Sequence, residues 1–319
     1  IPLNHMFSGV SNFSQGVDTT FAVIIGISLF FLIGISAVIV YFIVKYNKKK
    51  NPVASEIEGS TKLEIIWTVI PLILVLFMFW LGWHSYIPSR RVPEGAMKIK
   101  VTAQMWSWRF EYANGIVEDT LYIPLNKDVT LNMNSVDVIH SLYIPAFRLK
   151  EDVVPGKDNY MWFKAMVPGT YDLFCAEYCG LRHSYMGTAV KVVDQKEFDA
   201  WYAAGPVKVD STVAAKPGFE GKLLTEQKGC IACHSSDGTK IVGPSYKGIF
   251  GHKAIVETNG KEREIKVDEA YIKKSILEPE ADIVKGFPKG SMPSYKGQLT
   301  DEQLDKIVEY IKTLSEETK

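Results

Sequence analysis

Two long uncharged apolar runs constrain the fold of this chain most strongly. The first, TTFAVIIGISLFFLIGISAVIVYFIV, occupies residues 19–44, and at about 1.5 Å per residue it exceeds the roughly 30 Å hydrocarbon core of a bilayer. The second, IIWTVIPLILVLFMFWLGWHSYI, occupies residues 65–87, and its internal Pro71 is an irregularity that membrane helices tolerate. The pattern predicts a transmembrane helical hairpin within residues 1–90.

The loop between the two runs sets the expected orientation of the hairpin. It carries four basic residues, namely Lys45, Lys48, Lys49 and Lys50. Because such residues concentrate on the cytoplasmic side, both termini and all of the chain after about Pro88 are expected outside the cytoplasm. The first run lacks the basic start and the cleavage site of a signal peptide, and we expect any such peptide to have been removed already. Unpaired thiols in that oxidising compartment ordinarily become disulfides.

The remaining sequence divides into two water-soluble parts. Over residues 91–200, short β-rich runs such as VTLNMN and NYMWFKAMV alternate with turn sequences, which predicts an all-β sandwich or barrel. The small-residue stretch AAGPVKVDSTVAAKPG predicts a linker over residues 201–217. Residues 218–319 are expected to form a small α domain. Its last helix has one apolar face, made by Leu304, Ile307, Val308 and Ile311, and a capping box at Thr300 and Gln303.

All four cysteines lie in two short motifs. Cys175 and Cys179 belong to FCAEYCGLRHSYMG, where His183 and Met186 follow at spacings of four and three. A local disulfide would need no such company, whereas thiolate, imidazole and thioether together select copper. His140, on an upstream strand-like segment, is the expected completing ligand. Blue-copper proteins use one cysteine, and two thiolates can bridge two ions, so the loop predicts a dinuclear copper pair.

The spacing Cys-x-Glu-x-Cys-x3-His-x2-Met, preceded by DVIHSLYIPAFRLKEDVVPGK and QMWSWRFEY, resembles the CuA domain of cytochrome c oxidase subunit II. The resemblance implies a cupredoxin-like Greek-key domain. It implies a set of copper-binding side chains: His140, Cys175, Cys179, His183 and Met186. It also implies that Glu177 binds copper through its backbone carbonyl and offers its carboxylate to a Mg site shared with subunit I.

Three further roles follow from the same resemblance. Trp106 matches the residue at which electrons enter, whereas Trp108 fits better as a buried sandwich residue. Glu64 matches a glutamate at the entrance of a proton path into subunit I, although a solvated carboxylate at a helix N-terminus explains it equally well.

The second motif, GCIACHSS, contains the C-x-x-C-H pattern of covalent c-type haem attachment through Cys230 and Cys233, with His234 as an iron ligand. Alone, the pattern also fits zinc or a redox disulfide. Met292, before the last helix, is the expected second iron ligand, as in class I cytochromes c. GPSYKGIFG resembles the haem wall of that family and is expected to pack Pro244 near His234. The other histidines singled out as surface or interface residues are His5, His84 and His252.

A subunit II fused to a cytochrome c domain resembles the caa-type oxidases of bacteria. The resemblance implies that the chain, in a bacterial cell membrane, takes electrons from a donor through haem c and CuA to haem in subunit I, where O2 is reduced to water with proton translocation. No catalytic residue is expected in this chain. Expected partners are subunit I, subunit III, the lipid bilayer and a donor such as a cytochrome c or a quinol-oxidising complex. The balance of 36 basic and 36 acidic residues gives no indication of a nucleic-acid partner.

Two alternatives remain open on the sequence. A CuA-containing nitric oxide reductase uses a similar subunit, since the domain that receives electrons does not reveal the terminal acceptor. A membrane-tethered electron shuttle or copper-handling protein without an oxidase partner is the other, although one helix would suffice for tethering.

Overall fold

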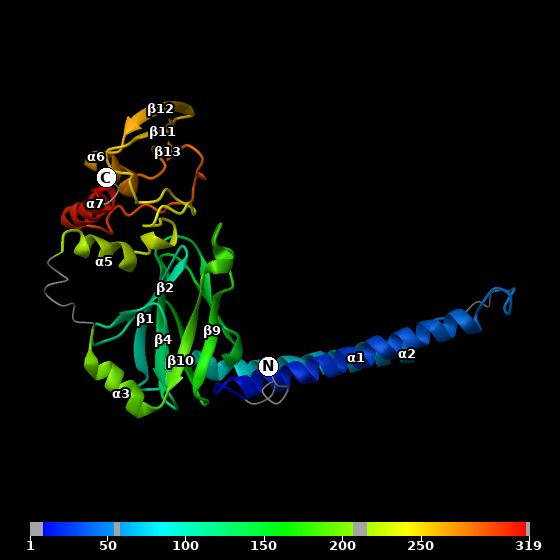
Figure 1. The fold of residues 1–319 in the computed structure, drawn as a ribbon. Helices are drawn as coiled ribbons and strands as arrows, with labels where there is room; N and C mark the ends of the chain where they lie inside the picture. Colours follow the sequence, from blue (N-terminus) through cyan, green and yellow to red (C-terminus); the bar gives the residue numbers. More distant parts are fainter. Residues whose placement is uncertain (1–8, 54–57, 207–215, 317–319) are drawn as a thin grey trace.

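A computed structural model describes residues 9–53, 58–206 and 216–316 of the chain. It contains a long helical hairpin, a β-sandwich and a smaller C-terminal domain that covers one end of the sandwich (Figure 1). His5 and residues 207–215 of the predicted linker lie outside the described residues.

The hairpin consists of α1 (Ser14–Lys45) and α2 (Thr61–Tyr86), and α2 continues into a short 3-10 turn, η2 (Ile87–Arg90). Both helices are long and apolar enough to cross a membrane. They begin about four residues earlier than the apolar runs alone predict, because polar residues form their first turns. Apolar side chains are exposed all around both helices, which is expected of helices surrounded by lipid or by another membrane subunit.

The sandwich contains two five-stranded sheets with the orders β3-β2-β1-β5-β8 and β4-β10-β9-β6-β7. The strands of the first sheet are β1 (Met97–Gln104), β2 (Ser107–Glu111), β3 (Val117–Glu118), β5 (Asp128–Ser135) and β8 (Asn159–Lys164). The strands of the second are β4 (Leu121–Pro124), β6 (His140–Ile144), β7 (Leu149–Val153), β9 (Gly169–Cys175) and β10 (Gly187–Val193), with a 3-10 turn, η3 (Pro145–Phe147), after β6. Both sheets are mixed, since β1 pairs in parallel with β5 and β4 with β10.

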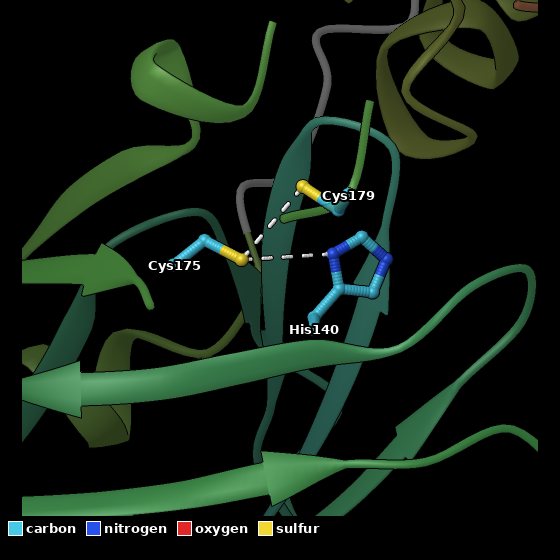
Figure 2. Close-up of side chains that lie close together, drawn as sticks. All are labelled: His140, Cys175 and Cys179. Atoms are coloured by element: carbon cyan, nitrogen blue, oxygen red, sulfur yellow. Dashed lines mark hydrogen bonds between the residues drawn. The ribbon is translucent and has the colours of Figure 1, made fainter. Parts of the chain in front are cut away.

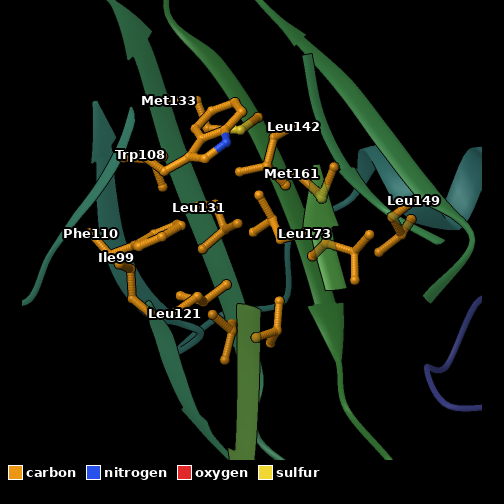
Figure 3. Packing of buried hydrophobic residues seen from close by; sticks show 14 of the residues in the cluster. Ile99, Trp108, Phe110, Leu121, Leu131, Met133, Leu142, Leu149, Met161 and Leu173 are labelled. Carbon is orange, nitrogen blue, oxygen red and sulfur yellow. The ribbon is translucent and has the colours of Figure 1, made fainter. Parts of the chain in front are cut away.

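The core of the sandwich lies between the two sheets, where alternate residues of each strand point inward. Ile99 and Leu131 from one sheet and Leu121 and Leu173 from the other are fully buried there (Figure 3). After β10 the chain forms α3 (Gln195–Ala204), which packs Trp201 against Tyr122 of β4 with ring centroids 4.8 Å apart. The helix thus extends into the first residues of the predicted linker.

The helical hairpin is joined to the sandwich by polar contacts near the start of α1 and the end of α2. Asp18 of α1 accepts a hydrogen bond from Arg148 at 2.7 Å, and Arg90 after α2 pairs with Glu151 at 3.0 Å. The Trp162 indole also donates to the Pro88 carbonyl at 3.0 Å. These contacts hold the sandwich at a defined position relative to both helices.

The C-terminal domain is built from α5 (Phe219–Gln227), η5 (Cys230–Ala232), α6 (Glu269–Leu277) and α7 (Asp301–Glu316). The predicted apolar face of α7 is buried. The capping box is present as well, since the Thr300 amide donates to the Gln303 side chain and the Gln303 amide donates to the Thr300 hydroxyl. Helices α5 and α7 cross at Gly221, where a Cβ atom would lie 2.6 Å from the carbonyl carbon of Lys306.

The C-terminal domain also contains a small sheet that the prediction of an α domain did not include. Its strands are β11 (Lys253–Thr258), β12 (Lys261–Lys266) and β13 (Ile283–Val284), in the order β12-β11-β13. The turn between β11 and β12 is Asn259-Gly260, with φ of 51° and 78°. Asn-Gly is the preferred sequence of such hairpin turns, so the sequence did carry the signal for this hairpin.

Candidate metal centres

The segment Phe174–Gly187, here called the copper loop, is positioned by three adjacent strands of one sheet. β9 lies between β6 and β10, and Leu142 of β6 pairs with Cys175, the last residue of β9. His140 begins β6, and Met186 immediately precedes β10. The intervening loop carries Cys179 and includes a 3-10 turn, η4 (His183–Tyr185). His140, Cys175 and Met186 therefore lie at strand ends that the sheet holds side by side, and the loop between β9 and β10 adds Cys179 and His183.

The two thiols and the His140 imidazole form the centre of this site (Figure 2). The sulfur atoms of Cys175 and Cys179 are 3.7 Å apart, and His140 Nδ1 lies 3.8 Å from the Cys175 sulfur. A disulfide would require about 2.05 Å between the sulfur atoms, so these are two separate thiols. All three side chains are buried, and their ligand atoms lie within 4.8 Å of one another.

The other predicted copper ligands surround this centre. His183 Nδ1 is 3.5 Å and the Met186 sulfur 3.7 Å from the Cys179 sulfur. The Glu177 carbonyl oxygen is 3.3 Å from the Cys175 sulfur. The site thus offers two thiols, two imidazoles, one thioether and one carbonyl, which is a donor set suited to copper.

The environment of the site favours metal-binding protonation states. The hydrogen bond with Cys179 is the main cause that lowers the pKa of Cys175. The same coupling raises the pKa of Cys179. The site therefore favours the thiolate form of Cys175, whereas a metal ion must displace the proton of Cys179.

His140 is oriented by a residue that the sequence analysis did not identify. Asp137 Oδ1 lies 2.8 Å from His140 Nε2, so the Nδ1 atom faces the sulfur atoms. Burial lowers the pKa of His140, but the hydrogen bonds with Asp137 and Cys175 outweigh it and raise that pKa. A carboxylate that fixes the remote nitrogen of a histidine is a common support of metal ligands.

Both tryptophans of the MWSW sequence are buried against this loop. The Trp106 indole donates to the Cys179 carbonyl at 3.0 Å, and the Trp108 indole donates to the Met186 carbonyl at 3.4 Å. The Glu177 side chain, by contrast, is exposed. Glu64 is exposed in the first turn of α2, at the end of the hairpin far from the copper loop (Figure 1). The structure therefore brings Trp106 and Trp108 to the copper loop but not Glu64.

The predicted haem ligand His234 is held in a fixed orientation. Its Nδ1 atom lies 2.8 Å from the Pro244 carbonyl oxygen, which leaves Nε2 available. The Tyr246 ring stacks on the imidazole with centroids 4.9 Å apart. A Cβ atom on Gly243 would lie 2.8 Å from His234 Nδ1, so only glycine permits this approach. Burial lowers the pKa of His234, which favours the neutral imidazole that binds iron.

Two apolar cavities are each lined by both His234 and Met292, so these two predicted iron ligands border the same interior space. Cys230 and Cys233 line the second of these cavities together with both residues. Burial raises the pKa of Cys233 to about 11, so this thiol stays protonated until it reacts. Tyr271 lines the first cavity, and its buried hydroxyl has no hydrogen-bond partner among the described residues. Such a hydroxyl can donate to a carboxylate of the haem.

The fold and the two sites define a membrane-anchored electron-transfer protein, and the comparisons with known proteins identify its family. Residues 4–82 match the family model of the cytochrome c oxidase subunit II transmembrane domain, and residues 111–193 match that of its periplasmic domain. Residues 219–315 match cytochrome c. Cytochrome c oxidase subunit 2 of Bacillus sp. strain PS3 is 31% identical over 296 residues, which cover 84% of this chain and 79% of the relative.

The cytochrome c oxidase subunit 2 of Alkalihalophilus pseudofirmus is 28% identical over 312 residues, covering 91% of this chain and 85% of the relative. A crystal structure of the periplasmic domain of subunit II from Bradyrhizobium japonicum is 32% identical and covers 36% of this chain and 96% of its own, with a TM-score of 0.34. The chain belongs to the cytochrome c oxidase subunit II family, with a cytochrome c domain in the same chain. It is therefore a subunit of a haem-copper oxidase, and its two soluble domains imply CuA and haem.

Proposed function

We propose that this chain receives the electrons for a bacterial terminal oxidase and passes them from haem c to CuA, and from there to haem in subunit I. The observation that carries the proposal is the proximity of the two sites within one chain. Met105 of the sandwich lines the haem cavity beside Cys230 and Cys233. The next residue, Trp106, is hydrogen-bonded to the backbone of the copper-loop residue Cys179.

Each site has a defined set of proposed ligands. The proposed copper ligands are His140, Cys175, Cys179, His183 and Met186, with the backbone carbonyl of Glu177. The proposed haem residues are Cys230 and Cys233 for covalent attachment and His234 and Met292 for the iron. When bound, both groups carry electrons without binding substrate. The chain's own part is to fix the ligands, keep water away from them and hold the two sites close together.

The remaining assignments concern the partners of the chain. The exposed carboxylate of Glu177 is available to a Mg ion at the surface of subunit I, and Trp106 is the residue at which electrons reach the copper site. Glu64 marks the entrance of a proton path, and the lysine-rich loop beside it faces the cytoplasm. An external cytochrome c or quinol-oxidising complex supplies the electrons, O2 is reduced with proton translocation in subunit I, and subunit III completes the complex.

These roles correspond to a division of the chain into four parts. The membrane anchor is residues 1–90, and the copper domain is residues 91–200. The linker, residues 201–217, connects the copper domain to the haem domain, residues 218–319.

The proposal is tested by stopped-flow reduction of the purified oxidase complex. Haem c should be reduced first and the copper afterwards, with consumption of O2. In a Cys230→Ala/Cys233→Ala variant the copper should still bind, but its reduction should require added cytochrome c. Copper reduction at an undiminished rate in that variant would contradict the proposed order. A complex that consumed nitric oxide but not O2, or a chain without a haem-bearing partner subunit, would favour the alternatives.

A further inference from the structure

Three consecutive residues, from the end of β1 into the turn before β2, contact both metal sites. They are Gln104, Met105 and Trp106, which we call the joint segment. Gln104 and Trp106 are buried, and Met105 is partly buried. The segment lies where the C-terminal domain meets the end of the sandwich.

On the haem side, the joint segment makes a buried side-chain hydrogen bond to the C-terminal domain. The Gln104 amide donates to the Tyr295 hydroxyl at 2.6 Å, and this hydroxyl donates to the Lys228 carbonyl at 2.9 Å. Gln104 is 9% and Tyr295 4% exposed. Tyr295 also lines the haem cavity beside Cys230, so the bond begins at the wall of the haem site.

On the copper side, the same segment is bonded to two parts of the metal site. The Met105 amide donates to Asp137 Oδ2 at 2.7 Å, and the other oxygen of Asp137 contacts His140. The Trp106 indole donates to the Cys179 carbonyl. A shift of the joint segment would therefore disturb both a predicted histidine ligand and a predicted cysteine ligand.

Direct ion pairing does not explain how the two domains are oriented. Within residues 91–206 and 216–316, no ion pair joins the sandwich to the C-terminal domain. The other side-chain hydrogen bond across this boundary runs from Arg182 to the Ala232 carbonyl. Hydrogen bonds are directional, and a buried one fixes orientation more strictly than diffuse charge attraction does.

We propose that Gln104 and Tyr295 are positioning residues that dock the haem domain on the copper domain and so control the rate of electron transfer between them. This inference rests on the proposed function, because it assumes that haem c is the donor to CuA. Removing Tyr295's hydroxyl leaves the buried Gln104 amide without this bond, and removing Gln104 leaves the hydroxyl bonded to the Lys228 carbonyl alone. Loss of a buried hydrogen-bond partner shifts such an equilibrium by about 5- to 100-fold. The covalent connection preserves proximity but not orientation.

The test uses Tyr295→Phe, Gln104→Leu and the double variant in the purified oxidase complex. Haem-to-copper transfer is measured after flash reduction, and the distance distribution between oxidised haem c and CuA is measured by pulsed electron paramagnetic resonance. We expect each single variant to lose about tenfold in rate or more and to broaden the distance distribution. The double variant should lose no more than Tyr295→Phe, because that single variant already removes the bond between Gln104 and Tyr295 together with the bond to Lys228.

Tyr160→Phe is the matched control. It removes a tyrosine hydroxyl that donates to the Arg90 carbonyl at 3.1 Å, away from the joint segment, and it should change neither rate nor distance. Because Tyr295 lines the haem cavity, Gln104→Leu repeats the test from the copper side.

Several outcomes would overturn the inference. One is an unchanged rate and distance distribution in both single variants, which would leave the proposed function intact. Another is a shifted haem potential in Tyr295→Phe with an unchanged distance, because it would place Tyr295 in the haem site rather than in docking. Absence of haem-to-copper transfer in the unaltered protein would instead overturn the proposed function itself.

Discussion

Gly221→Ala is expected to destabilise the haem domain, although alanine is the better helix former. In the middle of a helix, Ala is favoured over Gly by about 1 kcal/mol. At this position, however, the new Cβ would lie 2.6 Å from the Lys306 carbonyl carbon and 2.7 Å from Tyr310 Cβ. Carbon atoms pack at about 3.5–4.0 Å, so α5 and α7 would have to separate by about 1 Å.

The obstruction is mostly backbone, which cannot rotate away as a side chain would. Overpacking of this kind costs about 3 kcal/mol at the upper end of its usual range. Subtracting the gain in helix propensity leaves a net loss of about 2 kcal/mol in the free energy of unfolding.

The assay is denaturant unfolding of the full chain with two signals, haem absorbance for the C-terminal domain and copper absorbance for the sandwich. The haem transition should move to lower denaturant, whereas the copper transition should not move. Lys222→Ala, which alters the adjacent exposed residue of α5, should stay within about 0.5 kcal/mol of the unaltered protein. A Gly221→Ala protein that was as stable as the original would refute the close helix crossing.

Three other predictions concern the copper, the haem domain and salt. Cys179→Ser should abolish the mixed-valence copper signal in electron paramagnetic resonance. Met186→Leu removes a weak ligand, so it should shift the copper potential and keep some copper. An unchanged signal in Cys179→Ser would disprove thiolate bridging. Asp282 is 4% exposed; burial raises its pKa, but hydrogen bonds from Thr258 and two cations lower it to about 2, against an ordinary value of 3.8. Above pH 4, Asp282 should therefore contribute about 2 kcal/mol to the free energy of unfolding, and this contribution should be lost as the pH falls towards 2. Acid unfolding of Asp282→Asn should not show this loss. Haem-to-copper transfer in the intact chain should barely depend on salt, whereas a chain ending at Val193, supplied with separate cytochrome c, should slow as salt rises; a steep salt dependence in the intact chain would contradict intramolecular docking.

Features set by local sequence were predictable. The hairpin follows from two uncharged runs, and the apolar face of α7 follows from its helical spacing. The copper loop was also accessible, because four of its side-chain ligands lie within twelve residues, and only His140 comes from elsewhere in the sequence. Thiol, imidazole and thioether side chains rarely occur so close together, so their spacing alone indicates copper as the metal.

Contacts between distant segments could not be predicted in the same way. Gln104 and Tyr295 are 191 positions apart, and neither has a neighbour pattern that indicates a partner. The role of Asp137 depends on how the segment between β5 and β6 is folded, which composition does not reveal. The hairpin at Asn259-Gly260 is different, because its turn sequence was a local signal that the helical interpretation of the domain passed over.

The unbonded state of all four cysteines has a consequence for how the chain matures. Each pair lies close together in the sequence, and all four are free thiols in the structure. In an oxidising compartment each pair tends to close into a disulfide, which would block copper at one pair and haem attachment at the other. Each pair must therefore be in its dithiol form when its copper or haem arrives. A chain in which one pair had closed into a disulfide would keep one working centre and have a second that could not be loaded.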